Sequence, residues 1–351
     1  MAVPATQHPP PQHTVDQFCR LMLLAGLSLV LSACAVAAGQ HQGPGDRGPA
    51  LEADYLIADD GYQLPLRRWP LSDEPRGAVL ALHGFNDYGG AFRVLADDIN
   101  DLGFNLYAYD QRGFGATEPA GIWPGQDLLI QDALTAARLL RDRYGDKPLY
   151  LMGKSMGGGI SILALTAEDP APVDGTVLIA PGVWGRDIMP WYQRFGIWVG
   201  EGLMPGLELS VEMAQNIGIE ASDDEEVLRS LAEDPLVQGG ANLDSISGVT
   251  GLMGDALKAS TELPGPTLIL YGDQDEIIPP EPFCKLLERL PEADPSPWRL
   301  AVYPGGYHML TRYTGAEQVH ADIMTWLQDS DATLPSGHET TREKAQEHLC
   351  D

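Results

Sequence analysis

Short apolar runs alternate with helical patterns along most of the chain. Five runs are almost continuously apolar and are each followed by Gly, Pro, Asp or His: residues 77–82, 104–109, 148–152, 176–180 and 267–271. Such runs are typical of strands buried on both faces of a parallel sheet. Between them, residues 129–144 and 283–290 carry apolar side chains at helical spacing. The alternation predicts an α/β fold with a mostly parallel, doubly wound sheet spanning residues 51–328.

Three segments depart from this alternation. Residues 51–69 alternate polar and apolar positions, which predicts an antiparallel pair at one edge of the sheet. Residues 185–262 interrupt the strand–helix order and predict a cap over the carboxyl ends of the strands. The cap's aromatic residues, Trp191 and Trp198 among them, fit either the core of a small domain or a lid that contacts lipid. Residues 329–351 have almost no aliphatic side chains and predict a charged, poorly ordered tail.

The amino-terminal segment has the pattern of a targeting signal. An apolar run from Leu21 to Ala33 precedes Cys34, and its length suits a secretory signal better than a bilayer span. The sequence Leu31-Ser32-Ala33-Cys34 resembles the lipobox of bacterial lipoproteins. That resemblance implies a signal peptide at 1–33, a lipid on Cys34 and a flexible tether at 34–50. An uncleaved anchor helix is the alternative, because residues 35–38 extend the apolar stretch.

The lipobox resemblance also implies a place in the cell. We expect the protein to be lipid-anchored in a bacterial cell envelope. Ala35 is not the Asp that retains many such lipoproteins at the inner membrane, so the outer membrane, facing the periplasm, is favoured.

Charge and cysteine content exclude several classes of protein. The chain has 22 Lys and Arg against 50 Asp and Glu, a formal net charge of −28, and no basic patch interrupts it. A field of that sign repels nucleic acid, so we expect no nucleic-acid partner. The four cysteines lie too far apart for a metal or redox motif and are too few for a disulfide-built scaffold.

The candidate chemistry centres on Ser155. Residues 153–157 read Gly-Lys-Ser-Met-Gly, directly after a predicted strand and before a helix-compatible stretch. This is the G-x-S-x-G motif in the strand–turn–helix context that exposes a nucleophilic serine. The ending Gly-Lys-Ser also resembles a phosphate loop, but that motif needs Gly where Pro148 stands. We therefore expect a serine nucleophile and no nucleotide cofactor.

A serine nucleophile needs a base, and histidine is the usual choice near neutral pH. Five of the eight histidines lie in the predicted signal, tether and tail: His8, His13, His41, His338 and His348. His320 falls in a helical stretch, and His83 ends the first core strand. His308 follows an apolar run at 299–303 and satisfies the chain order serine, acid, histidine. His308 is therefore the predicted base.

The acid and the oxyanion donors follow from the same order. Asp275 comes just after the run at 267–271 and is the predicted acid, with Asp273 and Glu276 as alternatives. Two backbone N–H groups must hold the oxyanion. Met156 supplies one because it follows the nucleophile at a helix start, and Phe85, in the loop after the first core strand, supplies the other. His83 then holds that loop in a structural role.

These motifs together resemble the α/β-hydrolase fold. His83-Gly84-Phe85, the stretch 110–115, the G-x-S-x-G turn, the stretch 272–275 and the stretch 303–308 are most similar to its monoacylglycerol lipase and lysophospholipase branch, which is also grouped with the serine aminopeptidases. The resemblance implies Ser155 as nucleophile, Asp275 as acid and His308 as base, with Phe85 and Met156 as oxyanion donors. It implies no metal and no cofactor.

The expected function is hydrolysis of carboxylic esters, with acylglycerols or lysophospholipids as substrates. An aminopeptidase or small-ester hydrolase of the same fold is the alternative, and the acidic run at 223–226 offers a carboxylate for a free amino terminus. The contrasting hypothesis is a non-catalytic binding protein of the envelope on a hydrolase scaffold.

Overall fold

The computed structural model of the chain describes residues 42–69, 74–203, 208–210, 219–293 and 295–350. The predicted signal peptide, the lipidation site Cys34 and residues 34–41 of the predicted tether lie outside these residues. The region from Gly43 onward forms one compact unit, and only this unit is described below.

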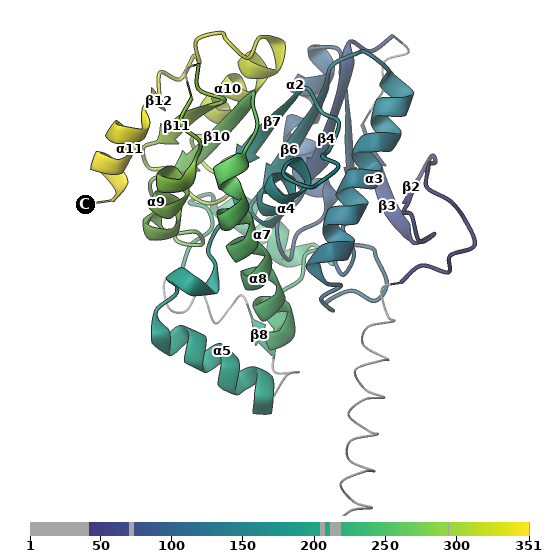
Figure 1. The fold of residues 1–351 in the computed structure, drawn as a ribbon, viewed down its shortest axis with the longest axis horizontal. Coiled ribbons are helices and arrows are strands. Elements are labelled where there is room, and N and C mark those ends of the chain that lie inside the picture. Colours follow the sequence, from purple (N-terminus) through teal and green to yellow (C-terminus); the bar gives the residue numbers. More distant parts are fainter. Residues whose placement is uncertain (1–41, 70–73, 204–207, 211–218, 294, 351) are drawn as a thin grey trace, which may run out of the picture. The chain divides into compact units, whose positions relative to one another are not determined.

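A mixed sheet is the centre of this unit (Figure 1). Among the described residues it has ten strands, in the order β1-β2-β3-β5-β4-β6-β7-β10-β11-β12. The strands are β1 (Ala50–Leu51), β2 (Tyr55–Ile57), β3 (Gln63–Arg68), β4 (Gly77–Leu82), β5 (Phe104–Tyr109), β6 (Leu149–Lys154), β7 (Gly175–Ile179), β10 (Thr267–Gly272), β11 (Trp298–Tyr303) and β12 (Glu339–Thr340).

The six inner strands, from β5 to β11, run parallel. They coincide within one or two residues with the predicted apolar runs, because each is buried along most of its length. At one edge β1, β2 and β3 are antiparallel, as residues 51–69 predict. The doubly wound α/β fold is confirmed.

Helices cover both faces of the sheet (Figure 1). One apolar core lies between the sheet and the helices α3 (Gln126–Tyr144), α4 (Met156–Leu165), α8 (Leu243–Ala259) and α9 (Pro280–Arg289). The other lies between the sheet and the helices α2 (Arg93–Asp101) and α10 (Ala316–Gln328). Helix α3 ends at Gly145, whose φ of 59° permits the turn that a glycine at this position makes at a helix end.

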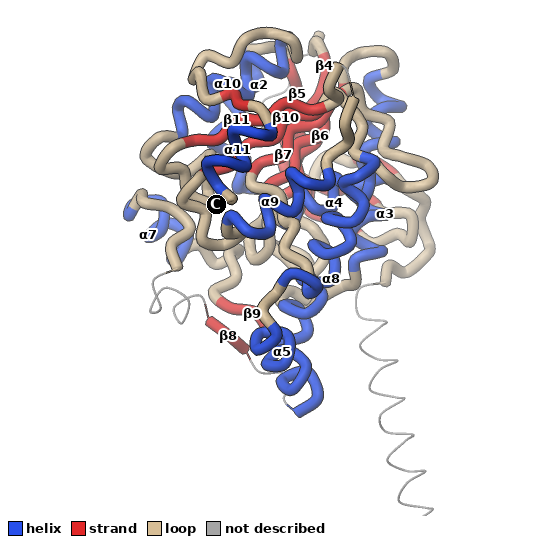
Figure 2. The backbone as a smooth tube through the Cα atoms, turned by 60° about the vertical axis from the view of Figure 1, so that its left-hand side comes forward, coloured by secondary structure: helices blue, strands red, loops and turns tan. Residues whose placement is uncertain are grey.

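The insert between β7 and β10 is only in part a cap. It contains α5 (Trp191–Leu203), β8 (Glu208–Ser210), α7 (Glu225–Glu233), β9 (Gly240–Asn242) and α8. Helix α8 packs on α4, and its Leu252 is fully buried. Figure 2 shows α5 and the β8–β9 pair away from the sheet. The predicted cap at 185–262 is therefore too long, because α8 belongs to the layer that covers the sheet.

The carboxyl-terminal segment is folded, which contradicts the predicted poorly ordered tail. Strand β12 pairs with β11, and α11 (Arg342–Leu349) packs on α9. A disulfide joins Cys284 of α9 to Cys350. The low aliphatic content does not predict this folded segment, because strand pairing and a disulfide hold it in place.

The end of the predicted tether also contacts the fold. The Gly43 N–H donates to the Asp60 carboxylate (2.8 Å), and the Gly45 N–H donates to the Asp60 carbonyl (2.7 Å). Gly43 approaches so closely that a Cβ there would lie 2.3 Å from the Asp60 carbonyl oxygen. The contacts begin at residue 43, so the tether prediction is wrong for residues 43–50.

Candidate active site

Ser155 lies on a sharp turn between β6 and α4. Its φ of 53° and ψ of −120° are unusual for a residue with a side chain, and its N–H donates to the Ile179 carbonyl of β7 (3.0 Å). Such a conformation costs about 1–3 kcal/mol and persists only where the surroundings impose it. The strained turn brings Ser155 to the carboxyl end of the parallel sheet.

The two outer glycines of the motif are sterically required. A Cβ on Gly157 would lie 2.0 Å from the Leu82 carbonyl oxygen of β4, and one on Gly153 would lie 2.4 Å from the Ser161 hydroxyl. Real side chains do not approach this closely. The G-x-S-x-G pattern is therefore a packing condition for the turn, because α4 must start directly against β4.

Asp275 and His308 meet on the loops after β10 and β11, at the same edge of the parallel sheet as this turn. The His308 Nδ1 lies 2.8 Å from one Asp275 oxygen. The other Asp275 oxygen accepts from the N–H groups of Ile277 (2.9 Å) and Ile278 (2.8 Å). Both side chains are buried. A carboxylate held in this way keeps the proton on Nδ1 and leaves Nε2 free to accept another.

The two alternative acids bond elsewhere. One Asp273 oxygen accepts from the Gly305 N–H (2.7 Å), and the other lies 3.2 Å from the His348 Nε2. Glu276 accepts from the Glu220 N–H of the insert (2.7 Å). The structure thus brings Asp275, and neither of these two, to His308.

The loop after β4 lies directly against Ser155. A Cβ on Gly84 would be 3.1 Å from the Ser155 Cβ, so Gly84 allows a close approach of the two backbones. Phe85 follows Gly84, and Met156 opens α4. The two predicted oxyanion donors therefore belong to segments that flank the serine.

His83 has the structural role that the sequence predicts. The Gln111 N–H donates to its Nε2 (2.9 Å), so Nδ1 carries the proton and donates to the Gly84 carbonyl (2.8 Å). Complete burial lowers the pKa of His83, which keeps this imidazole neutral. Both ring nitrogens are used to fix the loop.

Residues 73–313 match the family model of the serine aminopeptidases, type S33. The chain belongs to the serine aminopeptidase S33 family.

Relatives of this S33 hydrolase include lipases. The monoacylglycerol lipase of Mycolicibacterium smegmatis is 28% identical over 272 residues, which are 76% of this chain and 93% of that protein. The monoglyceride lipase of Mus musculus is 27% identical over 295 residues, covering 82% of this chain and 94% of that protein.

Solved structures agree on the fold. The Paleococcus ferrophilus monoacylglycerol lipase has a TM-score of 0.60 and 25% identity, covering 76% of this chain and 98% of that one. A Saccharomyces cerevisiae monoglyceride lipase bound to a substrate analogue has a TM-score of 0.66 and 22% identity, covering 83% and 99%. The fold is that of the α/β-hydrolases, and this S33 hydrolase is a carboxylic ester hydrolase.

The stretch 110–115 has a structural role in the S33 hydrolase. The Arg112 guanidinium is buried and pairs with the carboxylates of Asp60 (2.7 Å) and Asp132 (2.7 Å). Asp110 accepts from Arg67 (3.1 Å) and from the Gly89 N–H (3.0 Å). These bonds join the antiparallel edge of the sheet to the loop that carries Phe85.

The insert contacts the loops that carry the predicted site residues at several points. The Met309 N–H donates to the Ala221 carbonyl (2.9 Å), and the Gln238 N–H donates to the Asn86 carbonyl (2.9 Å). The Tyr88 hydroxyl donates to Asp234 (2.7 Å). The insert is therefore bonded to the loop of His308 and to the loop of Phe85.

Two side chains of the acidic run at 223–226 form hydrogen bonds within the protein. Asp223 accepts from the N–H (3.0 Å) and hydroxyl (2.5 Å) of Thr314, and Asp224 caps α7 by accepting from the N–H of Glu226 (2.9 Å). Glu225 and Glu226 are exposed in the first turn of α7, where negative charge is favourable.

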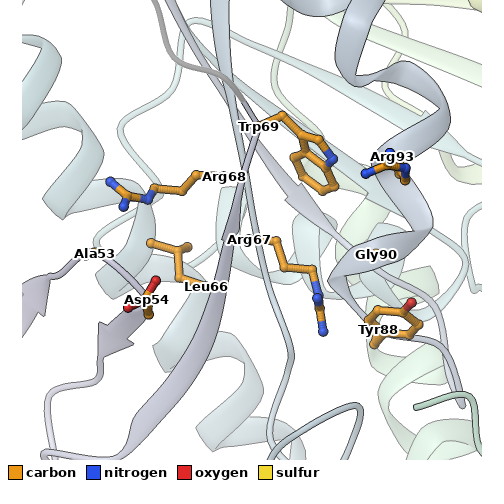
Figure 3. Close-up of a pocket in the computed structure, with 9 residues that line it drawn as sticks. All are labelled: Ala53, Asp54, Leu66, Arg67, Arg68, Trp69, Tyr88, Gly90 and Arg93. Carbon is orange, nitrogen blue, oxygen red and sulfur yellow. The ribbon is translucent and has the colours of Figure 1, made fainter. Parts of the chain in front are cut away.

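A polar hollow of about 570 Å³ lies along β3 and the start of α2 (Figure 3). Arg67, Arg68 and Arg93 line it together with Trp69 and Tyr88. Arg67 stacks on the Tyr88 ring at 4.4 Å. The hollow contains none of the predicted catalytic residues.

The described residues lack two kinds of feature, a metal-binding cluster and a membrane-spanning helix. They include no cluster of three or more His, Cys, Asp or Glu that could hold a metal ion. Within the same residues, no helix is both long and apolar enough to cross a membrane.

Sequence reasoning missed one group beside the serine. Lys154, the residue before Ser155, is buried with Asp87 and Arg312. The signal was a lysine within the motif, at the end of an otherwise apolar strand, but Asp87 and Arg312 lie 67 and 158 positions away from it in the chain. No local pattern connects them.

Proposed function

We propose that this S33 hydrolase cleaves acylglycerol esters through an acyl-enzyme on Ser155. The observation that carries the proposal is the 2.8 Å hydrogen bond between Asp275 and His308, on loops at the same edge of the parallel sheet as the strained Ser155 turn. The chain order serine, acid, histidine and the family membership support the same roles.

The proposed roles define a mechanism in two halves. The His308 Nε2 takes the Ser155 hydroxyl proton as Oγ bonds to the ester carbonyl carbon, and the Phe85 and Met156 N–H groups hold the resulting oxyanion. Asp275 stabilises the imidazolium. The C–O bond to the alcohol breaks, His308 protonates the leaving alcohol, and the acyl group remains on Oγ. Water then repeats the sequence and releases the fatty acid.

An acyl substrate is supported by the relatives and by the surface of the insert. The relatives from Mycolicibacterium smegmatis and Mus musculus are named as lipases of monoacylglycerols. On α5, Trp191, Tyr192, Phe195 and Trp198 are between 56% and 71% exposed. Exposed aromatics argue against the small-domain core and favour the lipid-contacting lid.

The aminopeptidase alternative has less support. It needs a carboxylate at the site to bind an amino terminus. Of the acidic run at 223–226, Asp223 and Asp224 are taken up by Thr314 and by the cap of α7, and Glu225 and Glu226 lie on the solvent-exposed first turn of that helix. The named relatives and these bonds together favour the esterase.

The decisive experiment compares substrates and labels. Monoacylglycerols, lysophospholipids, p-nitrophenyl esters of increasing length and aminoacyl-nitroanilides should be assayed with the wild type and S155A. We expect kcat/KM to rise about three- to fourfold per CH₂ until the acyl site is filled, since each buried CH₂ contributes about 0.8 kcal/mol. S155A should lose more than a thousandfold in kcat and should not react with a fluorophosphonate.

Other outcomes would reject parts of the proposal. Faster cleavage of the anilides, with a flat ester series, would favour the aminopeptidase. Absence of fluorophosphonate labelling in the wild type, together with tight binding of an ester, would favour a non-catalytic binding protein.

We further propose that a lipid on Cys34 anchors the enzyme in a bacterial envelope, with outer-membrane placement facing the periplasm. The Cys284–Cys350 disulfide supports an oxidising compartment, because structural disulfides are rare in the reducing cytosol. Growth with an alkyne fatty acid should label the wild type, and C34S should lose both label and membrane association. Unlabelled wild type in the soluble fraction would reject the anchor.

A further inference from the structure

Three buried charged side chains form a cluster next to Ser155. The Lys154 Nζ lies 3.5 Å from an Asp87 carboxylate oxygen, and the Arg312 guanidinium pairs with the same oxygen. Each of the three side chains is at least nine-tenths buried. Desolvated charges of this kind interact more strongly than surface pairs.

Each member of the cluster comes from a loop or strand end that carries part of the proposed machinery. Asp87 comes two residues after Phe85, Lys154 directly precedes Ser155, and Arg312 comes four residues after His308. One carboxylate therefore connects the oxyanion loop, the nucleophile turn and the loop of the base.

The cluster contains two cations and one anion. Burial and the positive charge of Arg312 lower the pKa of Lys154 to about 7, against the pull of Asp87 and Asp275. Burial alone would raise the pKa of Asp87, but the positive charges of Arg312 and Lys154 outweigh it and lower that pKa to about 2. These groups face Lys154 from the loops after β4, β10 and β11.

A stabilising role does not account for Lys154. Its folded-state pKa lies below the ordinary value of 10.5, so the protonated lysine destabilises the folded state. The cost is full below pH 7 and disappears as the pH rises toward 10.5. Asp87 already has a partner in Arg312, so a second buried cation is not needed to neutralise it.

We propose that Asp87, Lys154 and Arg312 are positioning residues that hold the oxyanion donor, the nucleophile and the base in one arrangement through their shared ion pairs. The inference rests on the proposed function, since it assigns the cluster to that same site. It gives these residues no contact with substrate.

The test uses K154M and R312M in the full chain. Each variant leaves Asp87 paired with one cation, so neither leaves an unpaired buried charge. We expect kcat for a short, water-soluble ester to fall about tenfold to a hundredfold, as small misplacements of reacting groups do, while KM stays within twofold. The rate of fluorophosphonate labelling should fall in parallel. K285M and R138M remove exposed charges on α9 and α3 as matched controls.

Two readouts separate positioning from a merely structural role. At pH 6, K154M should melt at the same temperature as the wild type or higher, although its kcat is lower. The ratio of wild-type to K154M kcat should fall toward one as the pH rises through about 7, because deprotonated Lys154 no longer pairs with Asp87 as an ion. Taking a ratio cancels the titration of groups that both proteins share.

Two results would contradict the positioning role. A lower melting temperature of K154M with unchanged kcat would reject positioning, as would a kcat ratio that stays constant from pH 6 to 9. A failure of the proposed function looks different, because the wild type and S155A would then react with the fluorophosphonate at equal rates.

Discussion

At the scale of single residues, hydrogen bonds distinguish side chains that sequence order leaves equivalent. The loop at 272–279 contains three acidic side chains within four positions, and order along the chain does not choose among them. The choice comes from the two isoleucine N–H groups that bind one Asp275 oxygen and aim the other at His308. A pairwise contact of this kind depends on the turn of the loop, which the sequence pattern does not specify.

Substitution of this acid tests the arrangement. In D275N the amide oxygen should stay with the N–H groups of Ile277 and Ile278, which places the amide nitrogen toward His308. That nitrogen donates and does not accept, so the imidazole is held in the wrong tautomer, and kcat should fall by about 10⁴.

D273N is the matched control for this change. Its amide oxygen still accepts from the Gly305 N–H, so kcat should stay within about threefold of the wild type, a change of less than about 0.7 kcal/mol. The measurement is kcat on a p-nitrophenyl ester. A greater loss in D273N than in D275N would reverse the assignment of the acid.

At the scale of elements, the sequence predicts the strands and helices that have a repeating apolar pattern and are buried. The inner strands and the helices α3 and α9 were predictable because each buries a long apolar run or stripe. The short strand β12 and helix α11 were not, because their order depends on pairing with β11 and on a disulfide rather than on an apolar pattern. The sequence pattern places helix α8 in the cap, because its position in the chain gives no sign of its contact with α4.

Helix glycines provide a prediction at this scale. In G157A the new methyl group would meet the Leu82 carbonyl at 2.0 Å, so α4 and β4 must move apart. We expect the free energy of unfolding to fall by about 3 kcal/mol or more. The comparison is G251A in α8, where no neighbouring atom lies within 4 Å of the added Cβ.

G251A should gain about 0.8 kcal/mol, because alanine is a better helix former than glycine. Urea unfolding of both variants measures the difference. Equal stabilities of G157A and G251A would contradict the close contact between α4 and β4.

At the scale of the whole molecule, long-range ties set the architecture around the site. Bonds from the insert reach the loops of Phe85 and His308, and the ion pairs of the Lys154 cluster connect the same loops. The sequence predicts the order of catalytic groups along the chain, because that order is a property of the fold. The sequence does not predict these hydrogen bonds and ion pairs. The residues that form them are far apart in the chain, and no local motif connects them.

Among the described residues, a disulfide provides a covalent tie between α9 and Cys350, directly after α11. It closes a loop across 66 positions, for which loop-closure entropy predicts a loss of about 4 kcal/mol in the free energy of unfolding when the bond is removed. The double variant C284S/C350S avoids a leftover thiol and should show this loss in urea. Its kcat at 25 °C should stay close to that of the wild type, because the bond joins α9 to the residue after α11 and lies outside the Ser155 turn and the loops of Asp275 and His308.

Dithiothreitol gives an independent measure of the same bond. It should lower the stability of the wild type to that of the double variant and leave the variant unchanged. The same contrast extends to the cell: protein retained in a reducing cytosol should have the lower stability, and protein exported to an oxidising compartment the higher one. If dithiothreitol left the free energy of unfolding of the wild type unchanged, the disulfide would not contribute to stability. The disulfide would then no longer support export to an oxidising compartment.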